Sequence, residues 1–91
     1  MQSKIEIDFA FAVGAKLLLG GWAVVGDDIS KHQLQFEGSS SDLLLFKRSD
    51  VSEVMQCPEQ YCSGFLVALN NTSKKLINVT WGEAIGSVDL D

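Results

Sequence analysis

The sequence predicts an all-β domain, an immunoglobulin-like sandwich of two antiparallel sheets with six to seven strands. Apolar and polar residues alternate along the first strand-like segment, which is typical of a strand with one face in a core. Further short segments of this kind recur at intervals of roughly ten residues, separated by turns rich in Gly, Ser and Asn. A chain of 91 residues fits a single domain, residues 1–91, with a small core.

The first two strands supply most of the expected core. Residues 5–13 form one strand, and its apolar side chains are expected to face the core together: Ile5, Ile7, Phe9, Phe11 and Val13, with Glu6 and Asp8 on the opposite side. Residues 16–25 form the next strand, where Gly20-Gly21 indicates a bulge or kink. Trp22 follows this pair, and we expect its ring in the core because large aromatic side chains carry much of the buried area in small domains.

Later strands are expected over residues 29–37, 43–46, 65–69 and 76–81, and residues 85–90 form either a last strand or the start of a linker. Leu34 and Phe36 are the inward candidates of the third strand. The run Leu43-Leu44-Leu45-Phe46 is apolar at every position, so we expect a strand buried on both faces.

One short helical turn is expected near residues 50–55. Asp50 is the expected cap, with Glu53 three residues later, and Pro58 should end the turn because it disfavours helical geometry at the preceding residue. Arg48 precedes this turn and is expected to pair with a carboxylate or with free carbonyls at the end of the sheet. A catalytic arginine–carboxylate pair is the alternative interpretation of Arg48 and Asp50.

Composition excludes several classes of partner. Twelve acidic residues against seven basic ones give a net charge of −5, so the chain offers no basic face for nucleic acid or anionic lipid. Residues 9–25 are apolar enough to suggest a signal peptide or a membrane span. Glu6 and Asp8 stand where a signal peptide would be basic, and Lys16 interrupts the apolar run. We therefore expect a cytoplasmic protein without membrane insertion.

The sequence contains no recognisable catalytic motif, and we expect no catalytic residue, cofactor or metal. His32 is the sole histidine and is expected on the solvent side of a strand, without a group that orients it as a base. Cys57 and Cys62 cannot complete a four-ligand zinc site. Free thiols are the default for these cysteines in a cytoplasmic chain, although a disulfide between them stays open.

Two aromatic residues are the candidates for contact with a glycan or a protein partner. Tyr61 lies in a polar loop, and Trp81 ends a strand next to Gly82, where its ring could be either buried or partly exposed. Exposed coplanar rings at these positions would indicate a carbohydrate-binding module. A third hypothesis is an assembly domain that pairs through an exposed sheet edge.

Three short motifs form an ordered series: Gly21-Trp22-Ala23, Arg48-Ser49-Asp50-Val51 and Ser63-Gly64-Phe65. Over residues 18–80 the series resembles the small β-sandwich domains attached to bacterial family 2 glycosyltransferases of surface-polysaccharide clusters. The chain departs from that pattern at Ser49, where proline is commoner, and in the loop that holds the two cysteines.

The resemblance implies a non-catalytic accessory domain, the N-terminal part of a longer polypeptide. Such a domain would position a neighbouring transferase domain or its carbohydrate acceptor. It also implies structural roles for the motif residues. Trp22 would fill the space between the sheets, Arg48 and Asp50 would fix the helical crossover, and Gly64 would allow close backbone passage before Phe65 enters the core. The sugar, the partner, the oligomeric state and the full length of the chain stay open.

Overall fold

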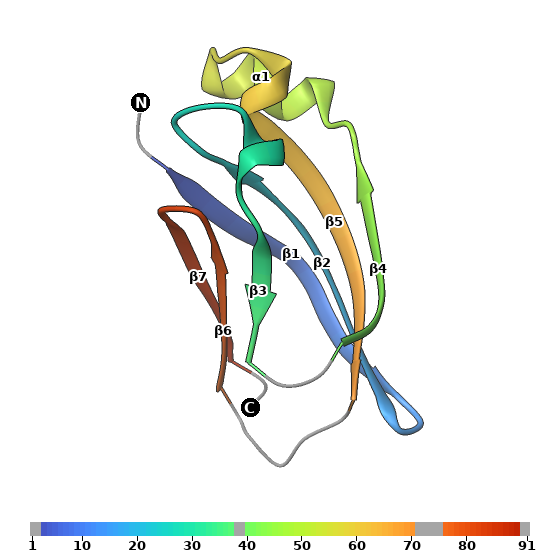
Figure 1. The fold of residues 1–91 in the computed structure, drawn as a ribbon. Coiled ribbons are helices and arrows are strands. Elements are labelled where there is room, and N and C mark those ends of the chain that lie inside the picture. The colour runs from blue at the N-terminus through green and yellow to red at the C-terminus, as the bar shows by residue number, and fades with distance from the viewer. Residues whose placement is uncertain (1–2, 38–39, 71–75, 90–91) are drawn as a thin grey trace.

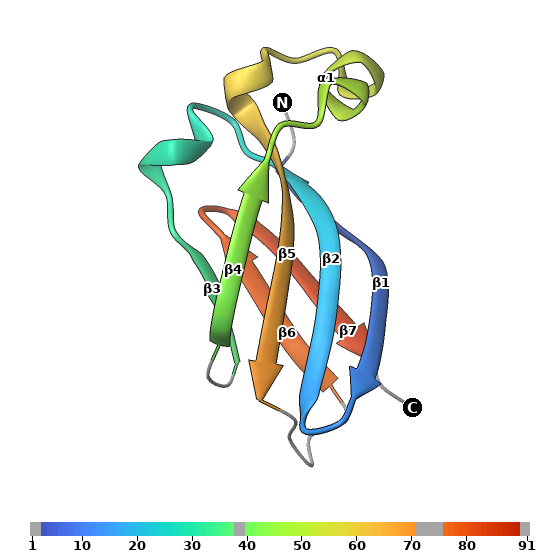
Figure 2. The same cartoon turned by 90° about the vertical axis from the view of Figure 1, so that its right-hand side faces the viewer.

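The computed structural model describes residues 3–37, 40–70 and 76–89 and shows two antiparallel sheets packed face to face (Figures 1 and 2). The strands are β1 Lys4–Val13, β2 Lys16–Val24, β3 Leu34–Phe36, β4 Ser40–Phe46, β5 Cys62–Asn70, β6 Leu76–Trp81 and β7 Ala84–Asp89. The helix α1 spans Ser49–Met55, and 3-10 turns span Ile29–Lys31 and Glu59–Tyr61. The expected all-β two-sheet sandwich is confirmed.

The strand order is β1-β2-β5-β4 in one sheet and β3-β6-β7 in the other. Lettered A to G along the chain, these sheets read ABED and CFG, which is the strand order of constant-type immunoglobulin sandwiches. Figure 2 shows the four-stranded sheet in front of the three-stranded sheet, with α1 beyond the end of β4. The last segment, for which a linker was the alternative, forms the strand β7 as far as Asp89, and residue 90 lies outside the described residues.

The core lies between the sheets and follows the period of two. Its side chains alternate along three strands: Leu17, Leu19 and Ala23 of β2, Phe65, Val67 and Leu69 of β5, and Ile77, Val79 and Trp81 of β6. Phe65 is fully buried and makes edge contacts with Phe36 and Trp81, at ring-centroid distances of 6.0 and 6.4 Å. Leu34 packs against the same cluster, so the inward orientation expected for it and for Phe36 is confirmed.

A β-bulge at Asp8 reverses the orientation of the second half of β1. Ile7 pairs with Gly21 and Phe9 pairs with Gly20, so Asp8 is an additional residue in the ladder. One extra residue turns every later side chain to the other face. Ile5 precedes the bulge and is buried, as expected. The prediction that Phe9, Phe11 and Val13 face the core is wrong, because these side chains follow the bulge and are 41, 49 and 54% exposed. The bulge lies on β1, opposite the glycine pair, and not in β2.

The strand β4 lies at the edge of its sheet, which corrects the prediction that it is buried on both faces. Leu43, Leu44, Leu45 and Phe46 are between 40 and 58% exposed. Among the described residues, β4 pairs with β5 on one side only, and the facing sheet has one strand fewer than the sheet that contains β4. An uninterrupted apolar run is thus compatible with an edge strand as well as with a central one.

The third strand and the start of α1 differ in detail from what the sequence predicts. Residues 29–37 begin as a 3-10 turn, because the Asp28 carboxylate accepts a hydrogen bond of 3.0 Å from the backbone N–H of Ser30. The strand β3 is correspondingly short. In α1 the N-cap position is Arg48, and Asp50 is the second helical residue, so Asp50 is not the cap that was expected.

The position of the bulge predicts different stability effects for two phenylalanines. We expect Phe65→Ala to lower the free energy of unfolding by about 3–5 kcal/mol, because it opens a cavity in the core. Phe11→Ala should cost less than about 1 kcal/mol, because its ring lies at the surface. Urea denaturation of both variants checks this, and losses of equal size would contradict the reversed orientation of β1.

Candidate functional site on the outer face of the four-stranded sheet

The outer face of the four-stranded sheet carries apolar side chains on every strand, which are exposed on β1, β4 and β5 and half-buried at Leu18 of β2. The pairing register aligns outward-facing positions of β1, β2, β5 and β4 in two rows, Phe11-Leu18-Ala68-Asp42 and Phe9-Gly20-Leu66-Leu44. All of these positions except Asp42 and Gly20 carry apolar side chains. Directly paired residues lie on the same side of a sheet. We use the name "apolar face" for the set Phe9, Phe11, Leu18, Leu44, Phe46, Leu66 and Ala68. Contiguous exposed apolar surface of this kind marks interaction sites in proteins.

Glycines on the two central strands allow rings from the edge strands to lie over the sheet. A Cβ atom at Gly20 would overlap the ring of Phe9, and one at Gly64 would overlap the ring of Phe46. The rings of Phe9 and Phe11 are 5.7 Å apart between centroids. Aromatic rings over strand glycines are a known means of fixing the register of neighbouring strands.

A shallow groove runs along the β4–β5 side of the apolar face. It encloses about 300 Å³ and is lined by Leu18, Leu44, Leu66 and Ala68, with Asp42 also in its wall. At the end of the face beside the β1–β2 turn, Lys16 Nζ donates a hydrogen bond of 2.7 Å to Asn70 Oδ1. The apolar surface therefore has polar groups along its border.

Arg48 crosses the opposite end of this face. Its Nε and Nη2 donate to the two carboxylate oxygens of Asp50 at 3.0 and 2.9 Å, and its Nη1 donates to Asp8 at 3.3 Å. A Cβ atom at Gly64 would lie 2.8 Å from the Cγ atom of Arg48, so the arginine passes directly over this glycine. The side chain thus connects the start of α1 to the bulge in β1, across the two central strands.

The arrangement holds both partners in their charged forms. The hydrogen bonds with Asp50 are the main cause of a raised pKa for Arg48, and the same contact lowers the pKa of Asp50 below its usual 3.8. The expected pairing of Arg48 with a carboxylate is confirmed. The bidentate geometry fixes the orientation of the guanidinium plane as well as its position.

Trp22 lies on this outer side, which corrects the prediction that it fills the space between the sheets. It pairs with Glu6 and Gly64, in the alternate positions to the buried Ala23, and is half-buried. The Lys4 ammonium lies 5.8 Å from the centre of its ring. Trp22 also packs against the cluster of Val24, Val51, Cys57 and Cys62 beneath α1.

The three sequence motifs therefore meet at one place in the fold. Trp22 and Gly64 are paired across β2 and β5, and Arg48 lies over Gly64 while it binds Asp50. A small pocket of about 140 Å³ separates Trp22 and Arg48 from Val54 and Met55 of α1. Phe65, the remaining residue of the series, points into the core as expected.

Neither aromatic candidate for glycan contact presents an open ring. Trp81 is only 2% exposed, and its indole Nε1 donates to the backbone carbonyl of His32 at 3.3 Å. Tyr61 is half-buried against the cluster beneath α1. The exposed rings among the described residues are those of Phe9, Phe11 and Phe46, and the sequence pattern does not single out any of them as a contact residue. The glycine pair opposite Phe9 was the available signal, because it indicates a bulge and hence a change of face.

The two cysteines belong to the packing beneath α1. Both are free thiols and both are buried. Burial raises the pKa of the Cys62 thiol, which keeps it protonated and weakly reactive. Within residues 3–37, 40–70 and 76–89, no group of three or more His, Cys, Asp or Glu side chains is arranged to hold a metal ion.

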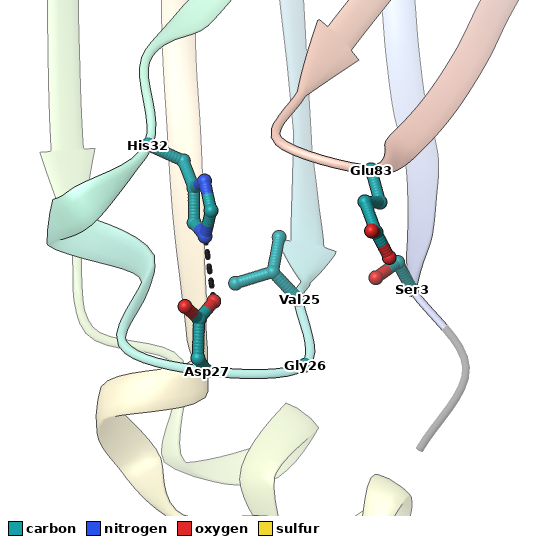
Figure 3. A pocket seen from close by; sticks show the side chains of 6 residues that line it. All are labelled: Ser3, Val25, Gly26, Asp27, His32 and Glu83. Carbon is teal, nitrogen blue, oxygen red and sulfur yellow. Dashed lines mark hydrogen bonds and ion pairs between the residues drawn. The ribbon is translucent and has the colours of Figure 1, made fainter.

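A second cavity, of about 270 Å³, lies between the turn after β2 and the turn between β6 and β7 (Figure 3). His32 Nε2 and Asp27 Oδ1 are 2.5 Å apart on one wall, and Figure 3 shows Glu83 beside Ser3 on the other. Asp27 thus orients His32, so the prediction that no group orients this histidine is wrong. Because the side chain of Asp27 is 51% exposed, the pair lacks the exclusion of water that a catalytic base needs.

Comparison of the chain with protein-family models, with curated proteins and with solved structures found no match. In the part of the chain that the structure describes, no helix combines the length and the apolar character needed to span a bilayer.

The contact between Arg48 and Asp50 predicts a loss of stability in acid. A carboxyl group whose pKa is lowered in the folded state stabilises the fold above its unfolded pKa, and this contribution disappears as the pH falls through the folded value. We expect the free energy of unfolding to fall as the pH drops below about 4, and to fall less in Asp50→Asn.

Urea denaturation across this pH range checks the assignment. Arg48→Gln, which removes the donor, should reduce the acid-dependent loss in the same way. The double variant should lose no more of the pH dependence than the stronger single variant, because both changes remove one interaction. A full acid-dependent loss in Asp50→Asn would show that this carboxylate is not responsible.

Proposed function

We propose that this chain is a non-catalytic, immunoglobulin-like accessory domain that docks onto another protein surface through its apolar face. The partner is a neighbouring transferase domain of a glycosyltransferase-like polypeptide, in the cytoplasmic part of bacterial surface-polysaccharide biosynthesis. The exposure of Phe9, Phe11 and Leu44, between 41 and 58%, on a regular sheet surface is the observation that supports docking most directly.

The chemistry of the face suits a protein partner. Interface centres are enriched in aromatic side chains and depleted of charged ones, with a polar rim around them. The apolar face has this composition, with three phenylalanine rings inside and Asp42, Arg48 and the Lys16–Asn70 contact at its border. Gly20 and Gly64 allow the rings of Phe9 and Phe46 to lie over the central strands. The apolar face can therefore contact a partner over a wide area.

The transferase partner is supported by the motif series. Trp22, Arg48, Asp50 and Gly64 are the residues that carry the resemblance to glycosyltransferase-associated domains, and they meet at one end of the apolar face. If those domains use the same motif residues to build this end of their sheet, they and this chain are expected to dock in the same way. Under this proposal the motif residues are positioning residues, and sugar transfer belongs to the partner domain.

A charge placed on the apolar face should uncouple the domain from its transferase. We expect Phe11→Asp in the native polypeptide to reduce sugar transfer at least tenfold and to expose the domain junction to protease, because docking would bury a carboxylate without a partner. Ile85→Asp is the matched control, since Ile85 is 73% exposed on β7, in the other sheet.

Two results would contradict the proposal. The first is equal transfer activity in the Phe11→Asp and Ile85→Asp polypeptides, with both domains folded by circular dichroism. The second is an intact mass of 9.9 kDa for the native protein, because a chain of that size leaves no room for a transferase domain.

A further inference from the structure

We propose that Cys57 and Cys62 are a reversible thiol–disulfide site, which closes into a disulfide within the chain when a low-molecular-weight disulfide such as oxidised glutathione is the co-reactant. The structure holds the pair in its reduced form. This inference does not depend on the transferase partner. It rests on the shared position of the two thiols beneath α1, on the contact between their side chains and on the backbone hydrogen bonds around them.

The chain turns back on itself between the two cysteines. Cys57 lies in the loop after α1, and Cys62 is the first residue of β5. The 3-10 turn Glu59–Tyr61 lies between them, and the N–H of Tyr61 donates to the carbonyl of Pro58 at 2.9 Å. Both cysteine side chains therefore reach the same buried cluster, which they share with Val24 and Val51.

The two thiols are in contact inside this cluster. A hydrogen bond joins the side chains of Cys57 and Cys62, and it raises the pKa of the Cys62 thiol in addition to the larger effect of burial. Two reacting groups held in contact have a high effective concentration, so closure within the chain is favoured over a bond between two chains. Among the described residues, no third His, Cys, Asp or Glu side chain joins the pair to form a metal site.

The loss of the thiol protons leaves no neighbouring carbonyl without a donor. The sulfur of Cys62 lies 3.7 Å from the carbonyl oxygen of Arg48 and 3.5 Å from that of Glu59. The Arg48 carbonyl also accepts the backbone N–H groups of Val51 and Ser52, at 3.1 and 3.2 Å. The Glu59 carbonyl accepts the N–H of Cys62. Oxidation therefore avoids the cost of a buried acceptor that has lost its last partner.

The reaction is a thiol–disulfide exchange in two steps. Cys57 attacks first, because it lies in a loop and Cys62 lies in a strand. Its thiolate bonds to one sulfur of oxidised glutathione, whose sulfur–sulfur bond breaks, and the departing thiolate takes up a proton. The thiolate of Cys62 then attacks the Cys57 sulfur and displaces the second glutathione, which is protonated in turn. Two protein thiols are oxidised, and one glutathione disulfide is reduced to two thiols.

The disulfide connects α1 to the four-stranded sheet. Two hydrogen bonds already join Cys57 to Ser52 of α1: the N–H of Cys57 donates to the Ser52 carbonyl at 3.1 Å, and Ser52 Oγ donates to the Cys57 carbonyl at 2.6 Å. On the other side of the bond, Cys62 pairs with Val24 in the ladder of β5 and β2. Oxidation thus anchors the end of α1 beside Trp22, which packs against the same cluster.

Intact-mass measurement in glutathione buffers of increasing oxidised fraction tests the site. We expect the chain to lose two hydrogen atoms, to retain no glutathione, and to return to its original mass after treatment with dithiothreitol. Peptide mapping should place the bond between residues 57 and 62. An unchanged mass in oxidised glutathione, a persistent glutathione adduct or a disulfide-linked dimer would each overturn the proposal.

Cys57→Ala and Cys62→Ala are the matched variants for the order of attack. We expect Cys62→Ala to stop at the mixed disulfide with glutathione, because no second thiol displaces the glutathione. Cys57→Ala should form its adduct at least tenfold more slowly, because the remaining thiol lies in a strand. Circular dichroism verifies that both variants are folded. Equal rates of adduct formation in the folded variants would overturn the assignment of Cys57 as the first nucleophile.

Stability and hydrogen exchange test the connection to α1. The oxidised chain should unfold at a midpoint about 5 °C above that of the reduced chain, because the bond restricts the unfolded ensemble. The amide of Cys57 should exchange at least tenfold more slowly after oxidation, whereas the amide of Lys31, in the turn after β2, should be unchanged. A lower midpoint or faster exchange at Cys57 would show that the fold does not accommodate the bond.

Discussion

The additional residue at Asp8 determines which side chains of β1 reach the core and which form the outer surface. Before it, β1 sends Ile5 into the core; after it, Phe9 and Phe11 lie on the outer face. One strand therefore contributes both to the packing between the sheets and to the exposed surface. A regular ladder would have directed Phe9 and Phe11 into the core, with Glu6 and Asp8 on the outer side of β1.

Arg48 makes use of the same irregularity. Asp8 in the bulge accepts a hydrogen bond from the guanidinium, which has passed over Gly64 from the far edge of the sheet. Together with the bidentate contact to Asp50, this connects both edge strands and α1 through one side chain. The contacts of Arg48 with Asp50 and Asp8 and the apolar face thus share one cause, because glycines on the central strands leave room for side chains from the edge strands.

The sequence was sufficient for the parts of the fold that depend on local pattern. It predicted the two-sheet architecture, most strands, the inward orientation of Leu34, Phe36 and Phe65, and the pairing of Arg48 with a carboxylate. It did not locate the bulge, because alternation shows which residues share a side but not where that side changes. The edge position of β4 was missed for a related reason, since an apolar run has the same composition at an edge and at the centre. Asp8 as a partner of Arg48 was also out of reach, because the two lie 40 positions apart.

The bulge turns Phe11 to the surface while Ile5 on the same strand stays buried. Thiol labelling of Phe11→Cys and Ile5→Cys under native conditions tests it directly, because Cys57 and Cys62 are buried and should react slowly. The bulge predicts rapid modification at position 11 and strong protection at position 5. Equal protection at both positions would show that β1 is a regular strand with one buried face, and the apolar face would not exist as described.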